Sequence, residues 1–267
     1  MKVIASGLTG TIGRFVENVN GYVGDVRNPS LYTQLEGYDS FLHLAGIVGV
    51  QNVQDALQES YEINVTATLT LAQECLKRNF SQFVYVSTSH VYGTSGNKII
   101  ESAVLNPRTD YAKQKLEAEL RLRDLFKKEY SNLVIVRLFS ILGAGMPPFT
   151  LGGLLDQISS HGNRQISFSD DQRDFLSPDQ AAKALKIIAE NNWKGDETIN
   201  LCTGKSLSVK AASKIYLASQ GHFLEEEIFK LGSSEVPIIV GDNSKLKEAI
   251  PGIIEVIDTF KPSKSAG

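Results

Sequence analysis

Four apolar segments, separated by long stretches of helical periodicity, constrain the fold of this chain more than any other feature. The apolar segments are Val3–Ala5, Phe41–Ala45, Phe83–Val86 and Leu133–Leu138, and the helical stretches include Tyr61–Lys77 and Tyr111–Lys128. Short apolar runs bounded by turns are typical of buried strands. Strands joined by helical crossovers run parallel, with helices on both faces of the sheet. The pattern therefore predicts an α/β fold with a doubly wound parallel sheet.

A glycine-rich segment follows the first predicted strand. Gly7, Gly10 and Gly13 are spaced Gly-x-x-Gly-x-x-Gly. Glycines permit a tight turn and a close approach of the backbone to a pyrophosphate. A helix expected from about Thr11 to Val19 would point its N-terminal amides at that anion. The order of strand, glycines and helix favours dinucleotide binding over a plain strand–turn–helix connection.

Three polar residues further along indicate acid–base chemistry. Tyr111 and Lys115 are four residues apart in a predicted helix and so share one face, while Thr88 ends a predicted strand. A Lys ammonium beside a Tyr hydroxyl favours the phenolate and lowers the pKa of the phenol. A phenol tuned in this way can exchange a proton with an alcohol or a ketone. Ligands of parallel sheets lie at the carboxyl ends of the strands, where Thr88 falls.

Together with later segments, these motifs resemble the extended short-chain dehydrogenase/reductase family, in particular its NAD-dependent epimerase/dehydratase members. The resemblance runs from Met1 to about Phe260, and the nearest kin are nucleotide-sugar epimerases and 4-keto-reductases. Its matching segments are Gly7–Gly13, Phe41–Gly46, Asn64–Thr68, Ser87–Gly93, Arg137–Phe139, Arg173–Phe175 and Asn200–Gly204. The fold it implies is a Rossmann-like sheet with a small C-terminal substrate lobe.

The resemblance implies a role for each matching residue. Tyr111 would exchange the proton on the C4 oxygen of a nucleotide sugar, Thr88 would hydrogen-bond that oxygen, and Lys115 would lower the Tyr111 pKa and hold the nicotinamide ribose. The implied substrate contacts are Ser89, His90, Ser140 and Arg173, the last on the diphosphate. The implied cofactor contacts are Gly7, Thr9, Gly10, Thr11, Ile12, Gly13, Arg14, Asp25, Val26, Leu44, Ala45, Gly46, Asn64, Ser87 and Phe139, with Tyr111 and Lys115.

The segment after the glycines leaves the choice between NAD and NADP open. A Rossmann unit carries a ribose-binding acid about 20 residues past its glycines, whereas Asp25 comes only 12 residues after Gly13. Gly24–Pro29 resembles the family's adenine-contacting segment, which would make the usual second strand missing or reduced. Arg14 and Arg27 would then face a 2′-phosphate or be ordinary surface residues. If Asp25 instead ends a shortened second strand, it would bind the ribose hydroxyls of NAD.

The residues after Thr88 bear on the reaction. The family's 4,6-dehydratases carry an acidic pair there, and this chain has Ser89-His90. His90 would be a second acid or base, or a polar wall of the sugar site. Ser140 stands where similar epimerases often carry Asn. We therefore expect a 4-epimerase, with an NADPH-dependent 4-keto-reductase as the alternative. A non-catalytic dinucleotide-binding regulator is the alternative from another class.

The predicted domains follow from the same matches. Residues 1–145 would form the dinucleotide-binding domain, joined by later strands near 164–204. Residues 146–262 would form mainly the substrate lobe, interleaved with the sheet, and 263–267 a frayed tail. The helices Tyr61–Lys77 and Tyr111–Lys128 are expected to pair with their copies in a homodimer, as related proteins do.

Composition excludes several partners. The net charge of −3 gives no footprint of a nucleic-acid partner. Two cysteines, Cys75 and Cys202, fit a reducing compartment, and no Cys or His cluster has metal-ligand spacing. Met1 leads straight into a strand, and no apolar run approaches the ~20 residues that span a bilayer. A cytoplasmic enzyme without membrane or metal partners is expected.

Overall fold

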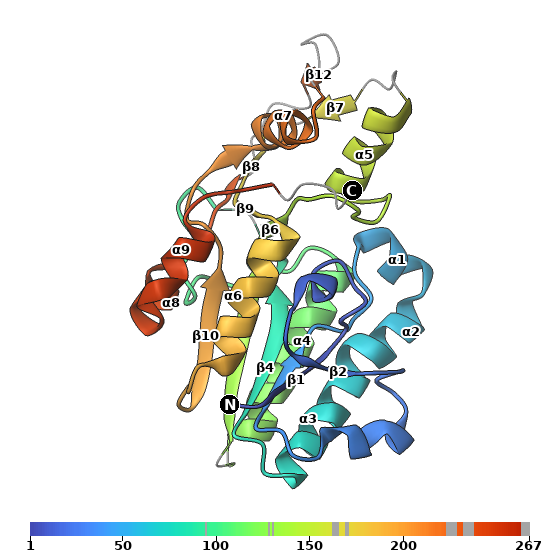
Figure 1. Ribbon diagram of the computed structural model, residues 1–267, viewed down its shortest axis with the longest axis vertical. Helices are drawn as coiled ribbons and strands as arrows, with labels where there is room; N and C mark the ends of the chain where they lie inside the picture. Colours follow the sequence, from blue (N-terminus) through green and yellow to red (C-terminus); the bar gives the residue numbers. More distant parts are fainter. Residues whose placement is uncertain are drawn as a thin grey trace.

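Six strands form one parallel sheet in the order β10-β5-β4-β3-β1-β2 (Figure 1). The computed structural model describes residues 1–93, 95–127, 129, 131–161, 166–168, 171–222, 229–231 and 238–262. The strands are β1 (Val3–Ser6), β2 (Asn20–Tyr22), β3 (Ser40–His43), β4 (Gln82–Thr88), β5 (Asn132–Leu138) and β10 (Asp196–Leu201). The four strands predicted from apolar runs are confirmed. The strand order reverses beside β1, which marks the place where such sheets bind ligands.

Alternate residues along each strand pack into two different layers. Phe41 and Phe83 face α3 (Thr68–Lys77) and α4 (Asp110–Phe126), while Leu42 and Val84 face α6 (Pro178–Glu190). This alternation follows from the two-residue period of a strand. The short helices α8 (Ser244–Ala249) and α9 (Ile254–Ile257) extend the α6 layer. The sheet is therefore doubly wound, as predicted.

Side-chain caps begin the two long helices that bracket the sheet. The hydroxyl of Thr109 accepts a hydrogen bond from the amide of Ala112 at the start of α4. Ser177 and Gln180 form a reciprocal capping box at the start of α6, with Pro178 in the first turn. Such caps satisfy amides that have no partner within the helix. The cap at Thr109 sets the position of Tyr111 in the first turn of α4.

The first crossover lacks its helix. Only a 3₁₀ turn, Gly13–Phe15, replaces the helix expected from about Thr11 to Val19, and that expectation is wrong. Residues 7–19 alone join β1 to β2, and the glycine turn uses about half of them. Asn18 also has a φ of +57°, which a helix does not allow. Ile12 packs against the core that α6 forms on the sheet.

A short second strand is present beside β1. Its residue Tyr22 is paired with Ser6, so both strands end at the same edge. The outer edge of β2 continues into Val23, whose backbone exchanges two hydrogen bonds with the side chain of Gln34 in the 3₁₀ helix Pro29–Leu35. The side-chain amide of Gln34 thereby satisfies the N–H and the C=O of Val23, which an edge strand would leave unpaired.

The predicted helix Tyr61–Lys77 is divided. It comprises the end of α2 (Leu57–Tyr61), a π-helical turn Glu62–Ala67 and α3, after a separate α1 (Val50–Asp55). Turns of π-helix inside α-helices often mark functional sites. Here the π-helical turn contains Asn64, a predicted cofactor contact.

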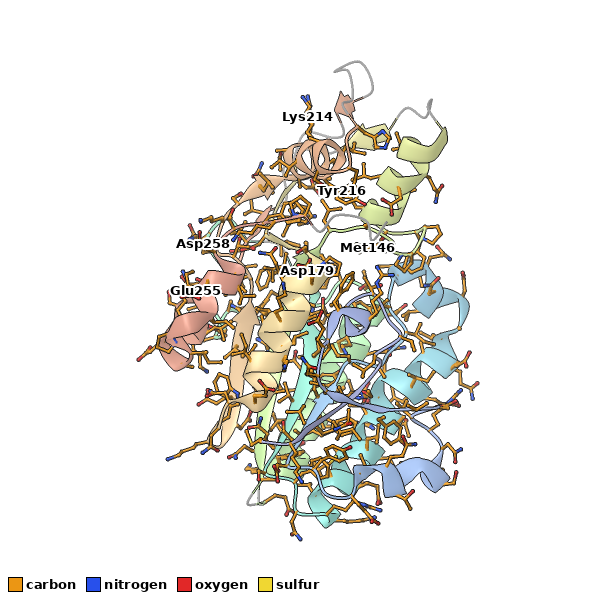
Figure 2. All side chains as sticks on the ribbon, viewed as in Figure 1. Met146, Asp179, Lys214, Tyr216, Glu255 and Asp258 are labelled. Atoms are coloured by element: carbon orange, nitrogen blue, oxygen red, sulfur yellow. The ribbon has the colours of Figure 1, made fainter. Side chains whose placement is uncertain are left out.

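A smaller lobe lies above the carboxyl ends of the strands (Figure 1). Its helices are α5 (Leu151–His161) and α7 (Val209–Ser219), and its strands are β6 (Ser140–Ile141), β7 (Ile166–Phe168), β8 (Gln172–Arg173), β9 (Phe175–Leu176), β11 (Leu207–Ser208), β12 (Phe229–Leu231) and β13 (Ile238–Ile239). Figure 2 shows Tyr216 within this lobe and Met146 at its junction with the sheet layer. Two further 3₁₀ turns among the described residues are Ser89–Val91 and Pro251–Ile253.

The lobe interleaves with the sheet because the chain returns to β10 between lobe elements. The predicted tail, 263–267, lies outside the described residues. Within the part of the chain that the structure describes, no helix has the length and apolar character needed to cross a membrane.

Candidate active site

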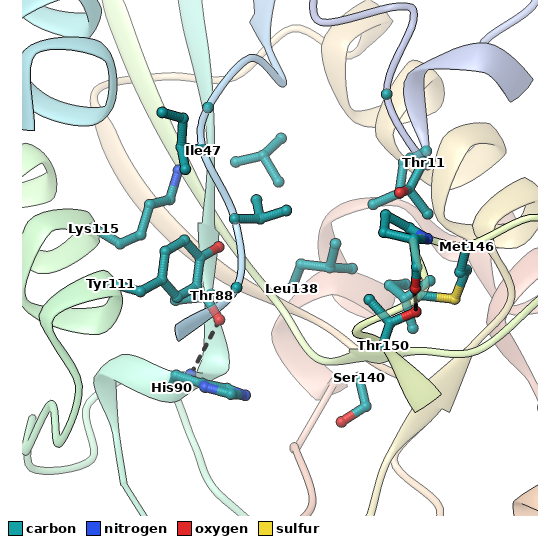
Figure 3. A pocket seen from close by; sticks show the side chains of 18 of the residues that line it. Thr11, Ile47, Thr88, His90, Tyr111, Lys115, Leu138, Ser140, Met146 and Thr150 are labelled. Atoms are coloured by element: carbon teal, nitrogen blue, oxygen red, sulfur yellow. Dashed lines mark hydrogen bonds between the residues drawn. The ribbon is translucent and has the colours of Figure 1, made fainter. Parts of the chain in front are cut away.

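A cavity of about 810 Å³ lies between the carboxyl ends of the strands and the lobe. It brings together most of the predicted site residues: Gly7, Gly10, Thr11, Ile12, Gly13, Leu44, Gly46, Asn64, Ser87, Thr88, His90, Tyr111, Lys115, Phe139, Ser140 and Arg173. Figure 3 shows Thr88, Tyr111 and Lys115 on one side of the cavity and Thr11 on the other. The cavity therefore joins the glycine turn to the predicted catalytic residues.

Six predicted contacts do not line the cavity: Thr9, Arg14, Asp25, Val26, Ala45 and Ser89. Ser89 is buried, and Val26 is buried in the core under α3. The guanidinium of Arg14 donates to the carbonyl of Ala144 at 2.7 Å. Ser89, Val26 and Arg14 are thus engaged within the protein by neighbours in the fold that the motifs do not reveal.

Residues from two loops complete the cavity wall and were not predicted. They are Ile47, Val48 and Gly49 after β3 with Val50 and Gln51 at the start of α1, and Met146, Pro147, Phe149 and Thr150 before α5 with its first residue Leu151, joined by Val86, Leu138, Ile141, Phe175 and Val209. Phe149 packs on Gly49, where an added Cβ would lie 2.8 Å from the ring. The Gly and Pro residues at 145–148 were the only signal in the sequence that a loop begins there.

Thr88, Tyr111 and Lys115 meet because β4 and α4 are adjacent. Thr88 is the last residue of β4, and its hydroxyl oxygen accepts a hydrogen bond from the amide of His90 at 3.3 Å. The same hydroxyl hydrogen-bonds Tyr111 and lowers its pKa. Lys115 lies one turn further along α4 and is buried. The local geometry predicted for these three residues is present.

Burial dominates the electrostatics of the Tyr111–Lys115 pair. Loss of solvent raises the pKa of Tyr111 to about 12, and the hydrogen bond from Thr88 offsets only part of this rise. The expected lowering of the Tyr111 pKa by Lys115 is therefore not found. Burial also lowers the pKa of Lys115 to about 7, against the attraction of Glu119. A lysine near half-protonation at neutral pH is a weaker cation than the spacing alone suggested.

A buried cluster of side chains lies next to Lys115. The Lys115 ammonium lies 4.2 Å from the centre of the Tyr85 ring. Glu119, one turn after Lys115, forms a buried ion pair with Arg137 at 2.6 Å. The same carboxylate accepts a hydrogen bond from Ser87 at 2.5 Å. These contacts connect α4 with β4 and β5 next to the catalytic residues.

Asn64 holds the loop that follows β3. Its side chain accepts a hydrogen bond from the amide of Ile47 at 2.8 Å and donates to the carbonyl of Ile47 at 3.0 Å. It also donates to the side chain of Gln114, which lies between Tyr111 and Lys115 in α4. Asn64 thus couples the cavity loop to the catalytic helix.

The glycine turn retains the features of an anion cradle. Gly7 has a φ of +76°, and a Cβ at Gly13 would lie 2.1 Å from the carbonyl oxygen of Gly7. Amides of Gly10 and Arg14 donate within the turn. Among the described residues, the amides of Thr11 and Ile12 donate no hydrogen bond. Two free amides beside the cavity suit a pyrophosphate, although the dipole of a full helix is missing.

The Arg173–Phe175 segment divides its roles between the cavity and the core. Arg173 lines the cavity and pairs with Asp171 at 2.8 Å. Asp174 is buried and accepts hydrogen bonds from the amides of Thr203 and Gly204, while burial raises its pKa to about 6. His90 faces the cavity, and desolvation, then the charge of Arg173, lower its pKa. Arg173 of the lobe and His90 just after β4 thus lie close enough on the cavity wall for the charge of one to affect the other.

A match to a known protein family identifies the family of this chain. The model described as the NAD dependent epimerase/dehydratase family matches residues 7–202, from the first glycine to the strand β10. The chain belongs to this family. The resemblance drawn from the motifs is therefore confirmed.

Within the NAD-dependent epimerase/dehydratase family, two relatives illustrate the range of reactions. An uncharacterized UDP-glucose epimerase, YtcB, of Bacillus subtilis is 30% identical over 67% of this chain and 58% of its own length. A GDP-6-deoxy-D-mannose reductase of Pseudomonas aeruginosa is 27% identical over 64% of this chain and 60% of its own length. The alignments thus span less than two thirds of either relative.

A solved structure of the same architecture shows the fold independently. The RMD protein of Pseudomonas aeruginosa, complexed with NADPH, superposes with a TM-score of 0.80 at 22% identity. The superposition covers 94% of this chain and 93% of that one. The Rossmann-like fold with its small lobe is confirmed.

Proposed function

We propose that this chain transfers a hydride at C4 of a nucleotide-activated sugar, with NAD or NADP as cofactor and 4-epimerisation as the net reaction. The observation that carries the proposal is the meeting of Thr88, Tyr111 and Lys115 on one wall of a cavity that ends at the glycine turn. The names of the two relatives, an epimerase and a reductase of nucleotide sugars, support the substrate class.

Each residue has one task at the C4 oxygen. Tyr111 takes the hydroxyl proton when the alcohol becomes a ketone and returns it on the reverse step. Thr88 donates to the Tyr111 oxygen and holds the substrate oxygen beside it. Lys115, which lines the same cavity, holds the nicotinamide ribose. A bound nicotinamide supplies the hydride chemistry and, when oxidised, a positive charge that favours the phenolate of Tyr111.

The lobe side of the cavity suits the rest of such a substrate. Arg173 presents a guanidinium of the kind that binds diphosphates, and Ser140 and His90 offer hydrogen bonds to a sugar. The apolar residues Met146, Pro147 and Phe149 would exclude water from the reacting centre.

Turnover of nucleotide sugars tests the proposal. The purified protein is incubated with UDP- and GDP-hexoses and either cofactor, and proton NMR follows the configuration at C4. Tyr111→Phe is expected to lower turnover by ~10²-fold or more, which is the usual size of lost acid–base help. The matched control is Tyr61→Phe, because Tyr61 hydrogen-bonds Glu117 outside the cavity. Cofactor binding without turnover of any nucleotide sugar would instead favour a non-catalytic regulator.

A second candidate is an NADPH-dependent 4-keto-reductase. An epimerase keeps one cofactor through both hydride transfers, whereas a reductase exchanges it after each turnover. A 3₁₀ turn replaces the first helix, so fewer helix N-terminal amides are available to bind a pyrophosphate. Weaker binding of the pyrophosphate favours exchange of the cofactor. Mass spectrometry of the purified protein separates the two candidates. Retained NAD supports the epimerase, and an empty site that accepts added NADPH supports the reductase.

A further inference from the structure

We infer that, in the part of the chain that the structure describes, no side chain distinguishes a 2′-hydroxyl from a 2′-phosphate on the adenosine ribose, so that NAD and NADP bind with similar affinity. The inference rests on the proposed function, because it assumes that the glycine turn holds a dinucleotide. Val23 occupies the position at which a residue that distinguishes NAD from NADP would lie.

The pairing of β1 and β2 locates that place. Because Ser6 is paired with Tyr22, the next residues, Gly7 and Val23, leave the sheet side by side at its carboxyl edge. In Rossmann units an Asp or Glu in this part of the chain binds the ribose hydroxyls of NAD, or an Arg accommodates the 2′-phosphate of NADP. Val23 is 73% exposed and carries neither a charge nor a hydrogen-bonding group.

The glycine turn lies within reach of this position. A Cβ at Gly21 would lie 3.0 Å from the side chain of Leu8 in the turn and 3.9 Å from that of Val23. Leu8 and Val23 therefore flank the same point of the sheet edge. A longer side chain at position 23 would displace no packed neighbour, because the position is exposed.

The charged residues nearest in sequence are already engaged. The carboxylate of Asp25 accepts hydrogen bonds from the guanidinium and the amide of Arg27. The same guanidinium also meets Glu59 at 3.4 Å and Glu62 at 3.9 Å. An acid and a base paired in this way neutralise each other, so neither acts as a lone charge towards a ribose or a phosphate.

Arg14, the remaining candidate, is directed elsewhere. Its guanidinium donates to the carbonyl of Ala144 and lies 5.0 Å from the centre of the Phe15 ring. An added Cβ on Gly145 would lie 3.1 Å from the same guanidinium. Arg14 thus fixes the loop before α5 and does not line the cavity.

Calorimetric titration with NADH and with NADPH tests the inference. The two dissociation constants of the unaltered protein are expected to agree within about threefold. The reason is that the two binding free energies should differ by less than the contribution of one hydrogen bond. Val23→Asp should then bind NADH at least about tenfold tighter than NADPH, and Val23→Arg should show the reverse preference, because charge-assisted hydrogen bonds are that strong. Val104→Asp and Val104→Arg are matched controls, since Val104 is 85% exposed and lies outside the cavity.

The outcomes separate this inference from the proposed function. A preference above about twentyfold in the unaltered protein, or equal ratios in the Val23 and Val104 variants, overturns the inference. Equal binding of both nucleotides without turnover of any sugar keeps the inference and overturns the function. Failure of both nucleotides to bind overturns the two together.

Discussion

His43 illustrates how burial decides the chemistry of a single residue. Its ring lies in the core, with Ser6 at 2.8 Å and Thr68 at 2.9 Å from its two nitrogens. Because the Thr68 hydroxyl donates to the carbonyl of Asn64, it accepts from the Nε2–H of His43, and Ser6 donates to Nδ1. His43 is therefore a hydrogen-bonded core residue. Burial, then the charge of Lys115, lower its pKa to about 3.

A prediction on pH dependence follows from that pKa. The unfolded chain takes up a proton at His43 below the ordinary pKa of 6.5, whereas the folded chain takes it up only near pH 3. The stabilisation is therefore complete above pH 6.5 and decreases as the pH falls. Between pH 7 and pH 5 this residue should lower the free energy of unfolding by about 2 kcal/mol. Urea unfolding of His43→Gln should lack this part of the pH dependence, while the exposed-site variant His222→Gln should keep it.

Arg173 carries the prediction for substrate binding. Its guanidinium lines the cavity beside His90, so we expect it to bind the substrate diphosphate. Arg173→Ala should raise the Michaelis constant for a nucleotide sugar about tenfold or more, with a smaller change in turnover, because a charged hydrogen bond is lost. The control is Arg78→Ala, whose side chain pairs with Glu74 on α3. An unchanged Michaelis constant would remove Arg173 from the site.

At the scale of elements, the glycine turn has to act without a following helix. The turn is held together by its own close contacts, since a Cβ at Gly13 would meet the backbone of Gly7 and Leu8. The position of the amides of Thr11 and Ile12 therefore depends on these glycines more than on a helix dipole. This dependence distinguishes the chain from an ordinary Rossmann unit.

Gly13→Ala tests that dependence. The added methyl group would force the backbone apart, so we expect a loss of about 1–3 kcal/mol in the free energy of unfolding, the usual cost of overpacking. The affinity for NADH should fall as the turn opens. Gly96→Ala is the control, because a Cβ there meets nothing within 4 Å. Equal thermal stability and equal NADH binding in the two variants would show that the turn tolerates a side chain.

For the whole molecule, the predicted homodimer rests on the outer faces of α3 and α4. Several apolar residues of these helices are used by the monomer itself: Ala72 and Leu122 are buried in its core, and Leu69 and Leu76 pack against it. Leu120 remains, with 53% of its surface exposed on α4. The apolar surface left for a partner is therefore smaller than the sequence indicated, and the dimer stays a prediction.

Light scattering checks the dimer directly. We expect a mass of twice the 29.2 kDa of the chain at micromolar concentration, and a shift towards the monomer in Leu120→Glu, because a buried unpaired charge opposes association. Ile215→Glu, which changes an exposed residue on α7, should leave the mass unchanged. A single-chain mass in the unaltered protein would contradict the prediction.

The sequence by itself determined four strands of the sheet, the helix that carries Tyr111 and Lys115, and the positions of the chemical groups, because these depend on local patterns. Apolar runs identify buried strands wherever the sheet places them, and a four-residue spacing keeps Tyr111 and Lys115 on one helix face. Thr88 and the glycines lie at strand ends, and parallel strands bring their carboxyl ends to one edge. The same local rules also predicted a helix after Gly13, where the short connection to β2 leaves room only for a 3₁₀ turn.

Only the tertiary structure decided how these groups are surrounded. The pKa of Tyr111 rises because protein replaces water around it, and Lys115 beside it is buried too. Asp25 and Arg14 lie outside the cavity lining and have partners that the glycine motif does not reveal: Arg27 for the first and Ala144, far along the chain, for the second. The loops that close the cavity come from two distant parts of the chain. Desolvation and long-range contacts are properties of the packed molecule, and a pattern along the sequence does not contain them.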